Sequence, residues 1–205
     1  MEDRPVGEEN LRTLINPDSD VLTGLAAMHH AELPASRVSR LGLPYTTEFY
    51  RFGASSCDES VIAVLADDGP AVGGAFVSFN PAGLTSRLAR HTRLIGALIR
   101  NPVLAGTLLT YEFISLGKRD ELNPENDPEL LAVFVSADWR GRGIGQVLLR
   151  AVEAATRERK LSRYIIRTED APTNRAISFY QREGFETQRT VNVCGLPFRI
   201  MMKHL

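Results

Sequence analysis

The segment that most constrains the fold is VFVSADWRGRGIG, residues 133–145. It continues the apolar run LLAVFV at 130–135, which has no polar face and is therefore typical of a central strand that is covered on both sides. Arginines and glycines follow, and apolar residues at helical spacing then predict a helix from about Gly143 to Lys160. A buried strand, a tight turn and a helix in this order indicate an α/β protein whose helices pack on a sheet.

The turn between this strand and this helix predicts an anion site. The first N–H groups of a helix have no intrahelical partners, and the helix dipole makes that end partly positive. Glycines let the backbone approach a diphosphate closely, and arginines add charge beside it. The residues concerned are Arg140, Gly141, Arg142, Gly143 and Gly145. Because no Gly-Lys-Ser/Thr sequence follows and the turn is not on the first strand, the pattern favours a carried cofactor over a hydrolysed nucleotide or a dinucleotide.

The rest of the chain alternates between strand and helix patterns. Strands are predicted at 11–15, 61–66, 71–79, 164–168, 186–193 and 198–203, and helices at 21–33, 36–50 and 174–183. The turn sequence Asp67-Asp68-Gly69-Pro70 between two of these strands predicts a hairpin. We expect an α/β (α+β) fold, with a mixed central sheet flanked by helices, in a single domain over residues 1–205.

Residues 81–110 form a predicted basic helical insert before the central strand. From Gly69 to Tyr111 the sequence contains no Asp or Glu, while arginines recur through the segment. Four apolar side chains share one helix face, which predicts a basic amphipathic helix that Asn101-Pro102 ends. These side chains are Leu84, Leu88, Ile95 and Leu98.

Composition excludes several classes of protein. A content of 43% hydrophobic and 24% charged residues is that of an ordinary globular protein. With 24 basic and 25 acidic side chains the net charge is −1, which argues against nucleic-acid binding through a global positive field. Cys57 and Cys194 lack metal-ligand spacing, so no metal is expected. The polar segment 1–10 is unlike a signal peptide, and we expect a cytoplasmic protein.

A second series of residues follows the glycine turn. It consists of Asn174-Arg175-Ala176, then Phe179-Tyr180, then Gly184-Phe185. Together with the Arg-x-x-Gly-x-Gly turn, this series resembles the GNAT acyltransferase superfamily, whose members bind acetyl-CoA through an Arg/Gln-x-x-Gly-x-Gly/Ala turn. The resemblance covers roughly residues 129–186. It implies the GNAT fold and the transfer of an acetyl group from acetyl-CoA to a primary amine, by direct attack in a ternary complex.

The resemblance also implies the residues of the cofactor site. Main-chain groups of Val133 and Val135 would pair with the pantetheine arm, because an amide-bearing ligand can bind an open strand edge. The turn from Arg140 to Gly145 would hold the pyrophosphate. Asn174 resembles the residue that bonds the pantetheine arm, with a helix N-cap as the alternative. The implied set is Val133, Val135, Arg140, Gly141, Arg142, Gly143, Ile144, Gly145 and Asn174.

Two catalytic residues follow from the same resemblance. Tyr180 resembles the family's general acid, which protonates the leaving thiolate, and aromatic packing in the core is its alternative role. Glu129 matches the position where several members place a general base, and a strand-end charge is its alternative role. Glu112 is a second candidate for the base.

The expected acceptor is a small-molecule amine that carries negative charge, such as a phosphorylated or nucleotide-linked amino sugar. The insert, with Arg87, Arg90 and Arg93, and the segment 33–51 are expected to wall its site. A protein or peptide acceptor, or a non-catalytic CoA-binding sensor, are the alternatives. Contact of the basic insert with an anionic membrane surface, simple extension of the core, and a homodimer also stay open.

Overall fold

The computed structural model describes residues 11–15, 17–66, 69–91, 93, 96, 106, 122–193 and 195–205. The strands are β1 (Leu11–Ile15), β2 (Glu59–Ala66), β3 (Ala71–Ser78), β4 (Glu129–Val135), β5 (Arg163–Glu169), β6 (Glu186–Val193) and β7 (Leu196–His204). The helices are α1 (Ser19–Glu32), α2 (Arg37–Arg40), α3 (Leu43–Ser55), α4 (Pro81–Arg90), the 3-10 helix η2 (Ala137–Trp139), α8 (Ile144–Glu158) and α9 (Arg175–Arg182).

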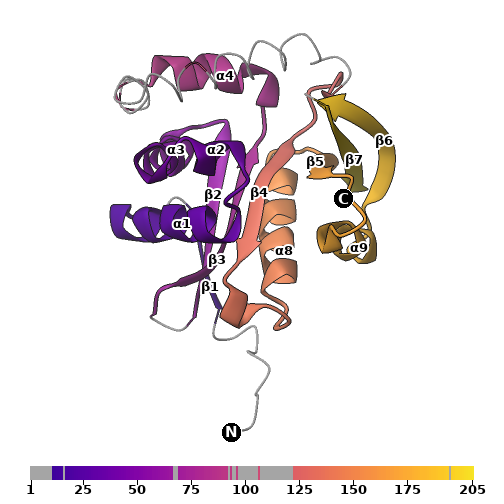
Figure 1. Cartoon of the computed structure of the whole chain (residues 1–205). Coiled ribbons are helices and arrows are strands. Elements are labelled where there is room, and N and C mark those ends of the chain that lie inside the picture. Colours follow the sequence, from indigo (N-terminus) through magenta and orange to yellow (C-terminus); the bar gives the residue numbers. More distant parts are fainter. Residues whose placement is uncertain are drawn as a thin grey trace, which may run out of the picture.

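The strands form one seven-stranded sheet in the order β1-β2-β3-β4-β5-β7-β6. Neighbouring strands are antiparallel except β4 and β5, which run parallel. Helices cover both faces of the sheet (Figure 1): α1 and α3 pack on one face, and α8 and α9 pack on the other. The expected mixed sheet flanked by helices is therefore confirmed.

The two helical layers explain the apolar strands. Successive side chains of a strand point to opposite faces of the sheet. In β4, Phe134 packs against the α1 and α3 layer, and its neighbour Val133 packs against the α8 and α9 layer. A strand in this position has no solvent-facing side, which is why the run at 130–135 contains no polar residue.

One predicted helix is divided into two. The sequence predicts a loose helix over residues 36–50, whereas the structure has α2 and α3 there. Gly42 separates them, because its φ of 89° lies outside the helical region. Pro44 then occupies one of the first positions of α3, where its missing N–H costs no helical hydrogen bond.

The predicted insert helix is also shorter than expected. It is represented by α4, which ends at Arg90, and His91 has an extended conformation with ψ of 101°. The prediction of one continuous helix as far as Asn101-Pro102 is thus wrong, because His91 already leaves the helix. That predicted helix end and Glu112 lie outside the described residues.

Candidate active site

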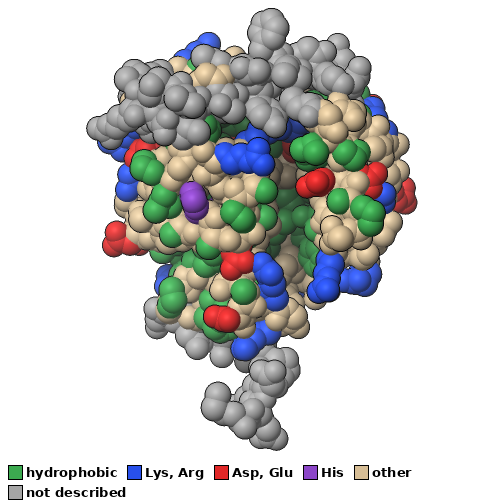
Figure 2. All heavy atoms as spheres, viewed as in Figure 1, with side chains coloured by type: hydrophobic (Ala, Val, Ile, Leu, Met, Phe, Trp, Pro, Cys, Tyr) green, Lys and Arg blue, Asp and Glu red, His purple; other side chains and the backbone are tan. Residues whose placement is uncertain are grey.

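The sheet opens between β4 and β5. These strands pair only at Glu129↔Ile165 and Leu130↔Ile166. Immediately after this point the register between β3 and β4 shifts, which leaves Leu131 without a partner on β3. A β-bulge of this kind bends a strand, and β4 parts from β5 beyond it (Figure 1). Figure 2 shows a hollow between the two halves of the molecule, with hydrophobic side chains on its floor.

The open edge of β4 offers main-chain groups to this hollow. Ser136 N donates to Val72 O at 2.9 Å, so Ser136 directs its backbone toward β3. In an antiparallel pair, alternate residues direct their N–H and C=O groups to alternate edges. Val133 and Val135 therefore direct theirs toward β5, where the ladder is absent. The structure brings both predicted pantetheine contacts to one unpaired strand edge.

The turn after β4 presents the start of α8. Gly141 and Gly143 have φ of 78° and 82°, which favour glycine. No side chain caps α8, and the first helical amide bonds are those of Gln146 and Val147 to Gly143 O. The N–H groups that precede them in the first turn thus have no intrahelical partner. The Ile144 side chain is 1% exposed and anchors this turn in the core.

Gly145 is required for a different reason from its two neighbours. A Cβ atom at Gly145 would lie 3.1 Å from Cζ of Phe179 on α9. The missing side chain therefore lets α9 pack closely against the start of α8. The sequence assigned Gly145 to the cofactor, and the structure adds this packing role.

The two arginines of the turn differ in their contacts. Arg140 is 60% exposed; its Nη2 bonds Oε2 of Glu32 at the end of α1, and its Nε donates to Val135 O at 3.3 Å. Oε1 of Glu32 accepts a hydrogen bond from Ala137 N at 3.0 Å. The Arg142 guanidinium lies over the Trp139 ring, 5.0 Å from its centroid. Sequence reasoning did not find Glu32, because nothing local links it to a turn about 100 residues later.

Tyr180 lies on α9 and is 8% exposed. Its ring centroid is 5.3 Å from that of Phe179 and 5.4 Å from that of Phe185. Burial raises the pKa of Tyr180 to about 12. The hydroxyl is therefore protonated at neutral pH, as a proton donor must be.

Asn174 fixes the start of α9. Its Oδ1 accepts a hydrogen bond from Ala176 N at 3.1 Å, which makes it the N-cap of the helix. Its Nδ2 donates to Thr168 Oγ1 at 2.8 Å and to Glu169 O at 2.6 Å. Asn174 thereby ties α9 to the end of β5, which is the capping role that the sequence left as the alternative.

Glu129 lies in a row of buried polar residues that crosses three strands. Ser78 on β3 stands opposite Glu129 on one side and Glu59 of β2 on the other. Glu59, Ser78 and Glu129 are 1%, 0% and 3% exposed, so each needs a partner within the protein. Arg167 Nε on β5 bonds Glu129, and Ser78 Oγ donates to Glu59 at 2.9 Å.

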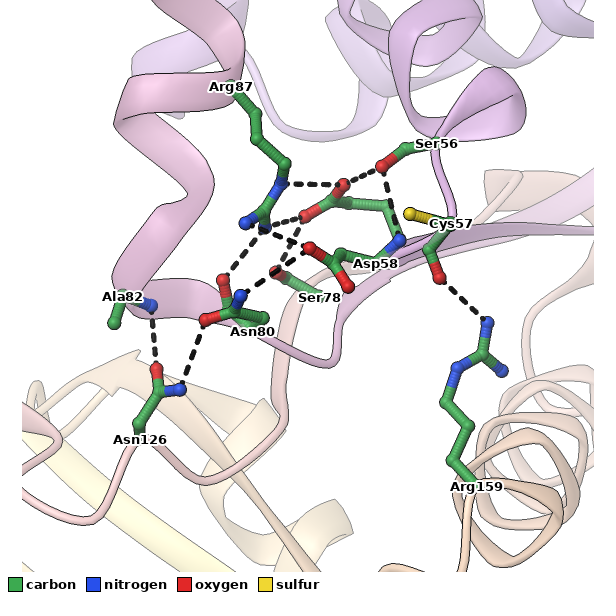
Figure 3. A network of polar contacts seen from close by, with 10 residues as sticks. Ser56, Cys57, Asp58, Ser78, Asn80, Ala82, Arg87, Asn126 and Arg159 are labelled. Carbon is green, nitrogen blue, oxygen red and sulfur yellow. Dashed lines mark hydrogen bonds and ion pairs between the residues drawn. The ribbon is translucent and has the colours of Figure 1, made fainter.

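Arg87 completes this row from α4. It forms an ion pair with Glu59 and a second one, of 3.1 Å, with Asp58. Figure 3 shows its side chain pointing from the helix into the cluster around Ser78. The expectation that Arg87 meets an anionic acceptor is therefore wrong, because two carboxylates of the chain already bind it. Sequence reasoning did not find that Glu59 is buried. The signal was available, because Glu59 lies two residues before Val61 and so shares the buried face of that residue on β2.

Other candidates lie apart from this site. A surface cavity of about 520 Å³ has Ser19, Arg51 and His91 in its lining, at the opposite end of α1 from Glu32. His29 is a core residue, with Nδ1 2.7 Å from Tyr50 Oη. Within the described part of the chain, no group of His, Cys, Asp and Glu could hold a metal ion. None of the helices described there is long and apolar enough to cross a membrane.

A family model described as the Acetyltransferase (GNAT) family matches residues 25–185. The chain belongs to the GNAT acetyltransferase family. The matched range includes the parted strands, the glycine turn and α9. Acetyltransferases of this family use acetyl-CoA and act on amine acceptors that are small molecules or proteins. The expected family and enzyme class are thus confirmed.

Solved structures of GNAT acetyltransferases share the fold. PaiA N-acetyltransferase from Thermoplasma acidophilum, in complex with coenzyme A, is 13% identical with a TM-score of 0.55, over 95% of this chain and 99% of that chain. Aminoglycoside 6'-acetyltransferase type Ii is 12% identical with a TM-score of 0.60, over 95% and 96%. The ribosomal-protein-S18-alanine N-acetyltransferase from Escherichia coli is 11% identical with a TM-score of 0.56, over 94% of both chains. No curated protein matches the sequence.

Proposed function

We propose that this GNAT acetyltransferase moves the acetyl group of acetyl-CoA to the primary amine of a small molecule, by direct attack while both substrates are bound. One observation carries the proposal: an open strand edge leads to an uncapped helix start. The edge offers main-chain partners to the amides of a pantetheine arm. The helix start offers unpaired N–H groups to a pyrophosphate.

The residues present fit acetyl-CoA. Val133 and Val135 would bond the pantetheine amides, and the amides from Gly141 to Gly145 would surround the pyrophosphate, with Arg140 and Arg142 beside it. Asn174 already uses its amide group in capping and in bonds to β5. Its part in this site is to hold α9, and with it Tyr180, in a fixed position.

Tyr180 and Glu129 share the proton transfers in this proposal. Acetyl-CoA supplies an acetyl group activated as a thioester. Glu129 takes one proton from the ammonium form of the acceptor, and the freed nitrogen attacks the thioester carbonyl carbon. Tyr180 donates its proton to sulfur as the carbon–sulfur bond breaks. The nitrogen loses a second proton as the amide forms, and this proton restores the Tyr180 hydroxyl.

The position of α4 supports a small acceptor. Arg87 fixes α4 to Asp58 and Glu59, and Asn126 Oδ1 accepts from Ala82 N at 2.7 Å. Both contacts hold the start of α4 beside Ser78 (Figure 3). Ser78 pairs with Glu129 on β4, so α4 is anchored at the end of the sheet where Glu129 lies. An anchored cover leaves less room for a peptide than an open groove does. We keep an anionic amino sugar as the proposed acceptor class, with Arg90 of α4 as its remaining cationic candidate, because Arg93 lines the separate cavity beside Ser19 and Arg51.

A thiol-release assay tests this function. Acetyl-CoA is mixed with the protein and a panel of amines: neutral and phosphorylated amino sugars, nucleotide-linked amino sugars, polyamines and peptides, with the products identified by mass. We expect acetylation of a small amine, fastest for an anionic one. Fastest turnover of peptides would replace the acceptor proposal. Calorimetry with CoA is the companion measurement, and no saturation at millimolar CoA would overturn the function itself.

A further inference from the structure

The Glu32 carboxylate contacts Arg140, the first residue of the turn that we assign to the pyrophosphate. Glu32 is the last residue of α1, and its side chain is 15% exposed. One carboxylate oxygen accepts the Ala137 backbone N–H at 3.0 Å, and the other binds Nη2 of Arg140. A backbone N–H and a guanidinium are the kind of donors that bind a phosphoryl group at such turns. Glu32 is therefore an anion of the chain that binds Arg140, the first residue of the proposed pyrophosphate turn, together with the amide of Ala137 just before that turn.

The contacts of Arg140 also show that its guanidinium is already bound by groups of the chain. Its Nη2 is directed to Glu32 and its Nε to Val135 O, so the guanidinium faces α1 and β4. Val135 is also one of the open-edge residues, so this contact engages a second proposed cofactor group. Because the Arg140 side chain is 60% exposed, it can turn toward another anion without disturbing the core.

The Glu32 carboxylate and the pyrophosphate of coenzyme A compete because both are negatively charged. Glu32 already binds Arg140 of the turn where the pyrophosphate would sit, and two anions that share one guanidinium repel each other. The repulsion acts within a Debye length of about 10 Å at 0.1 M salt, so added salt weakens it. The pyrophosphate and Glu32 also need the same Arg140 guanidinium.

We infer that Glu32 is an internal competitor of coenzyme A, which occupies part of the pyrophosphate subsite and lowers the affinity for coenzyme A until it is displaced. The inference rests on the proposed function. Displacement of Glu32 also releases the end of α1 from the turn after β4. The connection from α1 to α2, at residues 33–36, then loses one of its ties when coenzyme A binds.

Calorimetric titration with CoA at low and high salt tests this inference. Glu32→Gln keeps the size of the side chain and removes its charge. We expect the variant to bind CoA about three- to tenfold more tightly than the wild type at low salt, with the gain falling below about twofold at high salt. Glu48→Gln is the matched control: Glu48 is 16% exposed and paired with Arg51 on α3. It should leave the Kd for CoA within about twofold.

Hydrogen exchange of the wild type gives a second readout that needs no variant. Saturating CoA should slow exchange over residues 140–147 and speed it over residues 30–36. An unchanged or larger Kd in Glu32→Gln, or slower exchange at 30–36, would overturn the competitor role while the proposed function stands. If neither the wild type nor either variant binds CoA, the proposed function fails and this inference with it.

Discussion

Glu129 on β4 accepts a hydrogen bond from Nε of Arg167 on β5, across the point where the two strands part. Arg167 is the first residue of β5 beyond the paired positions, since Ile166 is the last that pairs with β4. The ion pair therefore continues the connection between the strands where the ladder stops. It also fixes the orientation of the carboxylate that we propose as the general base.

Replacing Glu129 separates these two roles. If Glu129 takes the proton of the acceptor, Glu129→Gln should lower kcat by about 100-fold or more and leave the Kd for CoA nearly unchanged. Glu59→Gln is the control, because Glu59 is equally buried in the same row and also pairs with an arginine. A Glu129→Gln rate within about threefold of the wild type would reduce Glu129 to a link between strands.

Tyr180→Phe removes the proposed proton donor without changing the ring. We expect kcat to fall by roughly ten- to a thousandfold, with CoA affinity retained, because the hydroxyl acts on the leaving sulfur only as the bond breaks. Tyr164→Phe is the control: Tyr164 is fully buried, and its hydroxyl has no hydrogen-bond partner among the described residues. Tyr164→Phe should keep the kcat and the free energy of unfolding of the wild type. Steady-state kinetics measures kcat and calorimetry measures CoA affinity. Equal kcat values in the two variants would assign Tyr180 to packing.

Gly141→Ala tests the anion-binding turn against a glycine of the same conformation. Gly141 and Gly195 have φ of 78° and 83°, and an added Cβ would meet no atom within 4 Å at either position. Both alanine variants should lose about 1 kcal/mol of unfolding free energy, because L-residues disfavour this region. Only Gly141→Ala should weaken CoA binding, by about tenfold or more. Equal affinity in both variants would remove Gly141 from the cofactor site.

Arg87→Ala and Arg90→Ala compare a paired and an exposed arginine of α4. Arg87→Ala leaves the buried Glu59 carboxylate without its guanidinium, and should lower the free energy of unfolding by about 3 kcal/mol. Arg90 is exposed, so its replacement should change stability by less than about 0.5 kcal/mol. Denaturant unfolding at neutral pH measures both. Similar small losses would mean that the Glu59 pair contributes little to anchoring α4.

His29 predicts a pH dependence of stability. Burial, with a smaller effect of His30, lowers the pKa of His29 from 6.5 to about 4. Between these pH values the unfolded chain binds a proton that the folded chain does not, so the free energy of unfolding should fall as the pH drops from 6.5 to 4. The loss is at most roughly 3 kcal/mol.

Denaturant unfolding across this pH range checks the slope. His29→Gln should flatten the pH dependence, and His30→Gln, on the same helix, should keep most of it. A slope that survives in His29→Gln would assign the acid sensitivity to other groups.

Several parts of the site could be predicted from sequence because their cause is local. The apolar run at 130–135, the glycines at 141 and 143 and the amphipathic helix after them specify a strand, a left-handed turn and a helix start through residues that are close in the chain. The same holds for the cap of α1: Asp18 directly precedes the helix and accepts hydrogen bonds from Asp20 N and Val21 N.

Partners of charged groups could not be predicted in this way. The sequence marks Arg87 and Arg140 as cations, but it does not say which anions they meet. Their partners Glu59 and Glu32 lie 28 and 108 residues away along the chain. Only the packing of α4 on β2, and of α1 beside the turn after β4, brings each pair together.

The sequence by itself determined the order of the elements, the turn that begins α8 and the family of the chain, because backbone conformation and side-chain periodicity are properties of neighbouring residues. Tertiary structure alone decided that β4 parts from β5 after Leu130, that Glu129 and Glu59 are buried beside Ser78, and that Glu32 reaches Arg140. These features depend on distances between segments far apart in the chain, which no local pattern specifies.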